Sequence, residues 1–128
     1  MKSLFLSLVA IFACEVQETR SQAAAASIQE ISVTELHGRM NSGSLLLVDV
    51  RTPGEYRDGH VPGARSIPLQ ELATKTTELP KTGDIYLICA VGGRSRKAAT
   101  ILVEQGFENP INIHGGSRAW RDQGYRLE

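Results

Sequence analysis

A lone cysteine follows an apolar run and precedes a glycine-containing loop. Residues 85–88 form the apolar run, Cys89 follows it, and the loop comprises Ala90, Val91, Gly92, Gly93, Arg94 and Ser95. A loop that leads from a strand into a helix directs backbone N–H groups and the positive end of the helix dipole at its first residue. Such a cup binds anions and favours the thiolate of Cys89 over the thiol. The pattern therefore predicts the active loop of an enzyme that handles sulfur.

The overall composition narrows the classes of partner. The chain has 128 residues, enough for one domain, and its 14 basic and 14 acidic residues balance. The sequence contains no basic stripe, which argues against a nucleic acid partner. Its two cysteines, Cys14 and Cys89, do not form a Cys-x-x-Cys pair, and the sequence has no His-x-x-x-His pair. We therefore expect no metal and no cofactor.

Residues 1–26 have the features of an export signal. After a positively charged start, the uncharged stretch Leu4–Ala13 has the length of a signal-peptide core and is too short to span a bilayer. Cleavage near Ala23–Ala26 would release a soluble protein. Alternatively, Ile11–Cys14 resembles the bacterial lipobox, in which Cys14 would receive a lipid and anchor the protein to the membrane. Both routes predict an exported protein of the bacterial periplasm, and an uncleaved start is the remaining alternative.

The rest of the chain, residues 27–128, alternates between helix and strand patterns. The expected strands are 28–31, 45–50, 66–67, 85–88 and 111–113, and the expected helices are 33–40, 53–57, 69–79, 95–105 and one around Ala119 and Trp120. Continuous apolar runs such as 45–50 and 85–88 are typical of strands buried on both faces. The alternation predicts one α/β domain with a mainly parallel sheet of about five strands and helices on both faces. Ligands bind at the carboxyl ends of such strands, where Asp49 and Cys89 are expected.

Several short motifs occur in a fixed order along this domain. They are Asp49-Val50-Arg51, Glu55-Tyr56, Gly59-His60-Val61-Pro62-Gly63-Ala64, Ile67-Pro68, Cys89-x-x-Gly92-x-Arg94-Ser95, Gly115-Gly116 with Trp120, and Gly124-Tyr125. With these motifs the chain resembles a single-domain rhodanese over about residues 28–127. Its short exported form resembles the small periplasmic members from bacteria. The resemblance implies a rhodanese-like fold and a thiosulfate sulfurtransferase or related persulfide carrier, with Cys89 as the sulfur-bearing residue.

The resemblance also implies a two-step reaction that needs no cofactor. Cys89 attacks the outer sulfur of thiosulfate, sulfite leaves, and cyanide or a thiol then removes the sulfur from the Cys89 persulfide. The implied partners are a small anionic sulfur donor and a thiol or protein acceptor. The chain departs from the family at Ala90 and Val91, where some thiosulfate-active members carry cations. This departure allows a less charged donor, such as a persulfide on another protein or a small thiol.

The length of the cysteine loop distinguishes sulfur transfer from phosphatase and arsenate reductase chemistry. Related phosphatases and arsenate reductases have the pattern Cys-x5-Arg, but the corresponding position here is Ser95, with Arg94 one residue early and Arg96 one residue late. A phosphate needs a bidentate arginine at a fixed place, so the spacing argues against phosphatase or arsenate reductase activity. A non-catalytic binding module on the same scaffold remains a second alternative, although the intact Cys89 argues against it.

Other charged and titratable side chains have expected roles. Arg51 either lies at the rim of the cup, where it would contact the donor, or pairs with Glu55 or Asp49. Asp49 itself is expected to be structural. His60 is expected to be a hydrogen-bonded histidine that holds its own loop in place, and His37 is expected to face solvent.

Overall fold

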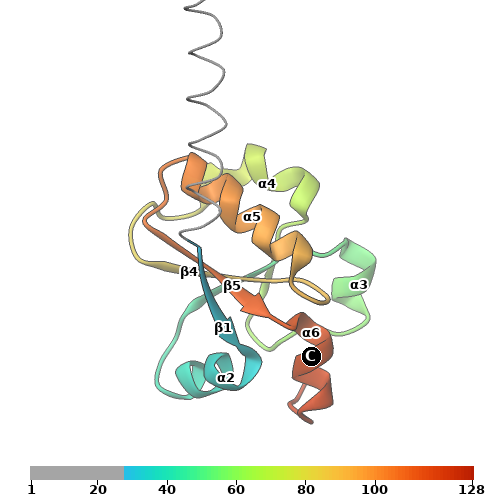
Figure 1. Cartoon of the computed structure of the whole chain (residues 1–128). Helices are drawn as coiled ribbons and strands as arrows, with labels where there is room; N and C mark the ends of the chain where they lie inside the picture. Colours follow the sequence, from blue (N-terminus) through green and yellow to red (C-terminus); the bar gives the residue numbers. More distant parts are fainter. Residues whose placement is uncertain (1–27) are drawn as a thin grey trace, which may run out of the picture.

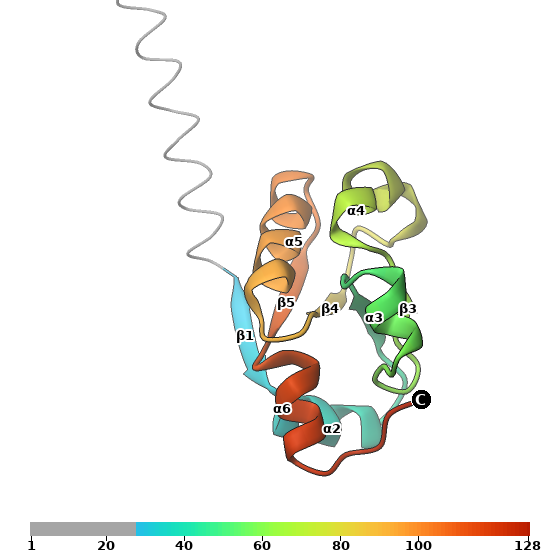
Figure 2. The same ribbon diagram turned by 90° about the vertical axis from the view of Figure 1, so that its right-hand side faces the viewer.

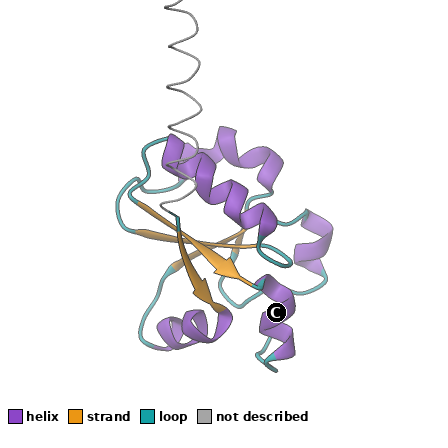
Figure 3. Cartoon of the chain, viewed as in Figure 1, coloured by secondary structure: helices purple, strands orange, loops and turns teal. Residues whose placement is uncertain are grey.

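The computed structural model describes residues 28–128, so the predicted export signal and Cys14 lie outside the described residues. The centre of the domain is a sheet, whose strands are orange in Figure 3. The strand order is β1-β5-β4-β2-β3. The strands are β1 (Gln29–Ser32), β2 (Leu46–Asp49), β3 (Arg65–Ser66), β4 (Asp84–Ile88) and β5 (Asn109–His114). Every pair of neighbouring strands is parallel. The predicted α/β class and the predicted sheet are therefore confirmed.

Helices cover both faces of this sheet (Figures 1 and 2). They are α2 (Val33–Asn41), α3 (Pro53–Arg57), α4 (Leu69–Lys75), α5 (Gly93–Glu104) and α6 (Gly116–Asp122), with a short 3-10 helix, η1 (Thr76–Glu78). On one face α4 and α5 pack through side chains such as Leu72 and Leu102. On the other face α2 and α6 pack through side chains such as Leu36 and Trp120. Within this described part of the chain, none of the helices combines the length and the apolar character that crossing a membrane requires.

The central strand β4 explains on which side of the sheet the cysteine lies. Alternate residues of a strand face opposite sides of a sheet. Ile85, Leu87 and Cys89 accordingly join the core beneath α4 and α5. Tyr86 and Ile88 join the other core, with α2 and α6. Cys89 therefore continues the alternation of β4 and enters the loop on the α5 side of the sheet.

Two helices differ from the sequence-based expectation. α5 begins at Gly93 rather than at Ser95, because Gly92 adopts a left-handed φ of 116° and the helix starts directly after it. The helix expected over residues 69–79 ends as an α-helix at Lys75 and continues as η1. Threonines occupy the first two positions of η1, and threonine has a lower helix propensity than the Leu, Gln, Glu, Ala and Lys residues that make up most of α4.

Candidate active site

The Cys89 loop lies where the carboxyl ends of β4 and β5 meet the N-termini of α5 and α6. Because β4 and β5 are neighbours in the sheet, the loops that follow them come together. The Ser117 N–H donates to the Cys89 carbonyl at 2.8 Å, and the Arg118 N–H donates to the Ala90 carbonyl at 3.1 Å. These two carbonyls are therefore satisfied by α6, on the outside of the loop. The loop can then direct its own N–H groups inward, toward the Cys89 sulfur.

Two glycines permit this arrangement. Gly116 has a φ of 61°, and a Cβ at this position would overlap the carbonyl groups of Cys89 and Ala90. Gly92 has a φ of 116°, in the region that residues with a side chain avoid. The sequence pattern predicts a place in the cup for Gly92, whereas Gly116 stands out in the sequence only as part of a motif. The close approach of α6 to the loop is the physical reason that glycine is needed at Gly116.

Hydrogen-bond donors surround the Cys89 thiol, which is only 1% exposed. The Gly92 N–H donates to Sγ at 3.0 Å, and the Ser95 hydroxyl lies 3.3 Å from Sγ. Burial raises the pKa of the thiol, whereas hydrogen bonds from the Ser95 side chain and from the N–H groups of Ser95, Gly92 and Val91 lower it. The donors outweigh burial, and the pKa of Cys89 lies below its ordinary value. This is the direction that the loop pattern predicts.

Arg94 belongs to the loop but binds a carboxylate rather than the sulfur. Its guanidinium donates to both oxygens of Glu55, at 2.7 and 2.9 Å. Glu55 also closes the capping box of α3 with Thr52. The hydrogen bonds from Arg94 lower the pKa of the Glu55 carboxyl to about 2. Arg94 thus ties α3 to the first turn of α5, and the donors that face Sγ are backbone N–H groups and the Ser95 hydroxyl.

Arg51 lies beside the loop with its guanidinium bound to Asp49. Its Nε donates to the Asp49 carboxylate at 3.0 Å, and its Nη2 donates at 2.7 Å to the same carboxylate and to the Gly59 carbonyl. Both members of this pair are buried. Of the roles left open for Arg51, the structure therefore shows the pairing with Asp49, and Asp49 has the structural role expected of it.

The predictions for two histidines have opposite outcomes. His60 Nδ1 lies 2.9 Å from the Tyr56 carbonyl oxygen, and its ring stacks on that of Tyr56, which confirms its role in holding the loop. The prediction that His37 faces solvent is wrong. Its ring stacks on Tyr125 with 4.0 Å between centroids and contacts Trp120 edge-on. The residues after α6 return to α2, and the periodicity of a single helix does not reveal such a contact.

A hollow of about 230 Å³ opens beside the loop. Its lining residues are Arg51, Glu55, Asp58, Ala90, Ser117, Arg118 and Arg121. Arg118 and Arg121 are one turn apart on α6 and exposed. Neither arginine is among the site residues predicted from the sequence. The available signal in the sequence is that the two arginines are three positions apart, on one face of a helix that follows Gly115-Gly116. This signal points to the site only because α6 begins against the Cys89 loop.

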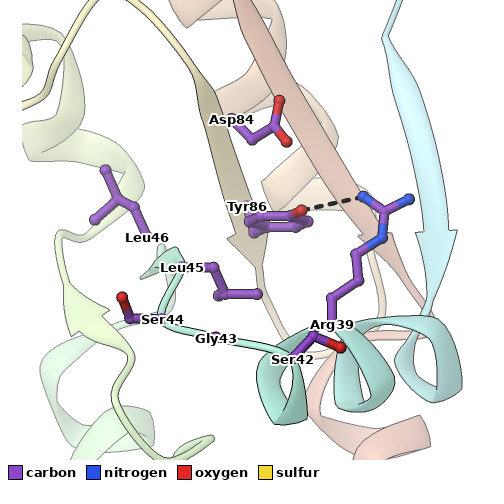
Figure 4. Close-up of a pocket in the computed structure, with 8 residues that line it drawn as sticks. All are labelled: Arg39, Ser42, Gly43, Ser44, Leu45, Leu46, Asp84 and Tyr86. Carbon is purple, nitrogen blue, oxygen red and sulfur yellow. Dashed lines mark hydrogen bonds between the residues drawn. The ribbon is translucent and has the colours of Figure 1, made fainter.

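A larger hollow, of about 480 Å³, lies at the amino ends of β2 and β4 (Figure 4). It is lined by Arg39, Ser42, Gly43, Ser44, Leu45, Leu46, Asp84 and Tyr86. The Arg39 guanidinium is engaged there, because it donates to the Tyr86 hydroxyl at 3.0 Å (Figure 4). This hollow contains no cysteine or histidine, so the Cys89 loop is the better candidate for an active site. Among residues 28–128, no three His, Cys, Asp or Glu side chains converge as a metal site would require.

A parallel α/β domain with a hydrogen-bonded cysteine before α5 is the combination found in a known protein family. Residues 32–123 match the model of the rhodanese-like domain, and the chain belongs to this family. It is 35% identical to a sulfurtransferase of Allochromatium vinosum over 98 residues, which cover 76% of this chain and 92% of that protein. It is also 41% identical over 97 residues to YrkF of Bacillus subtilis, named as a candidate sulfur carrier protein; the match covers 75% of this chain and 52% of YrkF. The chain thus spans about half the length of that relative.

Solved structures agree with the family assignment. The crystal structure of a rhodanese-like domain protein from Staphylococcus aureus is similar to this chain with a TM-score of 0.72 and 32% identity, over 79% of this chain and 97% of that one. The resemblance inferred from the sequence motifs is therefore confirmed. Family, fold and relatives together give this chain a role within the sulfurtransferase family.

Proposed function

We propose that this chain transfers sulfane sulfur through a persulfide on Cys89. The observation that supports this most directly is the Cys89 thiol, which is buried, accepts a hydrogen bond from Gly92 N–H and has a lowered pKa. A thiolate is the nucleophilic form of cysteine. Cys89 is the only cysteine among residues 28–128. A nucleophile from outside this domain must therefore remove the sulfur.

The proposed reaction has two balanced steps. In the first, the Cys89 thiolate attacks the outer sulfur of thiosulfate, a new S–S bond forms, and the thiosulfate S–S bond breaks with its electron pair leaving on sulfite. In the second, cyanide or the thiolate of an acceptor takes the terminal sulfur, and the electron pair of the persulfide bond returns to Cys89. Both steps pass through anions, which inward-facing N–H groups stabilise.

The charges beside the cup support an anionic donor. Ala90 and Val91 carry no charge, and the Val91 side chain is exposed. Arg118 and Arg121 line the adjoining hollow from α6 and contribute two positive charges. Of the two acidic side chains in the same lining, Glu55 is paired with Arg94, so Asp58 contributes the one further negative charge. These cations would attract a donor such as thiosulfate, or the anionic end of a small persulfide, toward the loop. The last helix would thus supply positive charge that Ala90 and Val91 lack and that Arg94 does not offer, because Arg94 is paired with Glu55.

Intact mass spectrometry tests the persulfide. After incubation with thiosulfate or, in a second arm, with a small-thiol persulfide, we expect the full chain to gain about 32 Da, one sulfur atom. Cyanide should then remove this sulfur as thiocyanate. Cys14→Ser is the matched control and should still gain the sulfur, whereas Cys89→Ser should not. An unmodified wild-type chain with both donors, and no thiocyanate, would refute the proposal and favour a non-catalytic binding module.

We further propose that residues 1–26 direct export to the bacterial periplasm, either as a soluble protein or with a lipid on Cys14. The support is the uncharged stretch Leu4–Ala13 after a positive start. The mass of the mature protein isolated from its host distinguishes the routes. An N-terminus near Ala23–Ala26 indicates soluble export, and a lipid-modified N-terminal Cys14 indicates anchoring. A chain that keeps its first residues would refute the export signal.

A further inference from the structure

The Ser95 hydroxyl has two neighbours but a single proton. Ser95 is fully buried, and its Oγ lies 2.5 Å from Asn112 Oδ1 and 3.3 Å from Cys89 Sγ. An amide oxygen is an acceptor only, and a thiolate is also an acceptor. The hydroxyl can donate to one of them at a time. Asn112 and an ionised Cys89 therefore compete for the same proton.

The orientation of the Asn112 amide is set by its other partners. Its Nδ2 donates to Glu30 Oε1 at 3.1 Å and to the Gly92 carbonyl at 3.3 Å. A carboxylate and a carbonyl accept hydrogen bonds but cannot donate them, so the amide nitrogen must face them and Oδ1 must face Ser95. Glu30 is itself paired with Arg96 of α5. The negative charge of Glu30 polarises the amide and makes Oδ1 a stronger acceptor.

We infer that Asn112 is a positioning residue that competes with Cys89 for the Ser95 hydroxyl proton and so limits how far the cup stabilises the thiolate. This inference rests on the proposed function. When Cys89 is a thiolate, the hydroxyl turns to Sγ and leaves Oδ1 without its donor. When Cys89 carries the persulfide, Sγ is a neutral member of an S–S bond, and the hydroxyl turns back to Oδ1. No proton enters or leaves the network in this exchange.

The competition serves the attacking step. The nucleophilicity of a thiolate falls as the pKa of its thiol falls, so a cup that holds the anion too firmly makes a poor nucleophile. Asn112 offsets part of the stabilisation that Ser95 would otherwise provide. It also keeps the buried Ser95 hydroxyl hydrogen-bonded after the sulfur has become neutral, which avoids an unsatisfied donor in the core.

The titration of Cys89 in two variants tests the inference. In the full chain with Cys14→Ser, Cys89 is the only thiol, and its thiolate is followed by ultraviolet absorbance against pH. Asn112→Leu leaves the Ser95 hydroxyl with Sγ alone, so the titration midpoint should move to lower pH. At a pH below the midpoint the thiolate fraction should rise roughly three- to tenfold, the factor expected from one net hydrogen bond. Ser95→Ala should move the midpoint to higher pH.

The double variant separates competition from a general loosening of the loop. If Asn112 acts through Ser95, adding Asn112→Leu to Ser95→Ala should leave the midpoint of Ser95→Ala unchanged. The charged and titratable groups around this network are Glu30, Arg96, His114, Arg94 and Asp49, which all variants of this cycle retain. The inference would be overturned if folded Asn112→Leu had a raised Cys89 midpoint. It would also be overturned if Asn112→Leu shifted the Cys89 midpoint equally with and without Ser95→Ala.

A second substitution keeps the test decisive if Asn112→Leu does not fold. Glu30 lies on the exposed edge strand β1, so Glu30→Gln should preserve the fold. It should lower the Cys89 midpoint, and the decrease should be smaller when Ser95→Ala is also present. Equal decreases in the two backgrounds would mean that Glu30 acts only through its charge and would overturn the inference. None of these measurements requires sulfur transfer, so failure of the persulfide assay would be distinguishable from failure of the competition.

Discussion

Replacing Gly116 with alanine tests whether α6 holds the Cys89 loop with its N–H groups inward. Gly116 has a φ of 61°, and a Cβ there would overlap the backbone carbonyls of Cys89 and Ala90. Gly124 provides a matched control just beyond the other end of α6. Its φ is 79°, and a Cβ built on it meets no atom within 4 Å. The two substitutions share the backbone strain and differ in the contact with the loop.

The structure sets the expected difference in the free energy of unfolding. An alanine held in the left-handed region costs about 1–2 kcal/mol, and Gly124→Ala should lose about this much. Gly116→Ala must in addition push the loop away and stretch the hydrogen bonds from α6 to the Cys89 and Ala90 carbonyls. Each such bond contributes about 0.5–1.5 kcal/mol. We therefore expect Gly116→Ala to lose about 2–5 kcal/mol in total.

Urea unfolding measures this difference, with the fluorescence of Trp120 as the probe. Trp120 is the single tryptophan of the chain and is buried against the sheet. A displaced loop also turns N–H donors away from the sulfur, so Gly116→Ala should raise the pKa of Cys89 and slow persulfide formation, whereas Gly124→Ala should leave both unchanged. If the two variants lost the same free energy of unfolding and had the same Cys89 titration, α6 would not be what holds the loop with its N–H groups inward.

Three further perturbations have expected outcomes. The pKa of Glu55 is about 2 in the folded chain, below its ordinary value of 4.5, so its ion pair with Arg94 stabilises the fold above about pH 4.5 and this contribution is lost as the pH falls toward 2. Over that interval the free energy of unfolding of Glu55→Gln should therefore fall less than that of the wild type, as measured by urea titrations at a series of pH values. Arg118→Gln combined with Arg121→Gln should raise the KM for thiosulfate about two- to tenfold, leave kcat nearly unchanged and weaken the dependence of KM on salt in steady-state assays. Trp120→Phe removes part of a buried side chain and the hydrogen bond of 2.8 Å from Nε1 to a backbone carbonyl. It should lower the free energy of unfolding by about 1–3 kcal/mol, as measured by denaturation followed by circular dichroism. The folded variant should still form the persulfide.

The local patterns of the sequence were sufficient to predict the architecture of the domain. A continuous apolar run such as 85–88 is consistent with a strand covered on both faces, and helical spacing between such runs places the covering helices. The cysteine at the end of the run, followed by Gly92, was sufficient to predict an N–H cup with a lowered thiol pKa. The strand, the loop and the N–H donors of the cup come from residues close together in the chain, whereas the contact with α6 that holds these donors inward comes from residues 116–118.

The partners of the loop came from the tertiary structure alone. Arg94 meets Glu55, 39 positions earlier in the chain, and Ser95 meets Asn112, 17 positions later. Neither pairing follows from periodicity, because each depends on which strands are neighbours in the sheet. The adjacency of β4 and β5 brings Asn112 and the N-terminus of α6 to the cysteine. The sequence by itself therefore determined that a cysteine stands at the end of a buried strand among N–H donors of its own loop, whereas strand order decided which distant side chains share its hydrogen bonds.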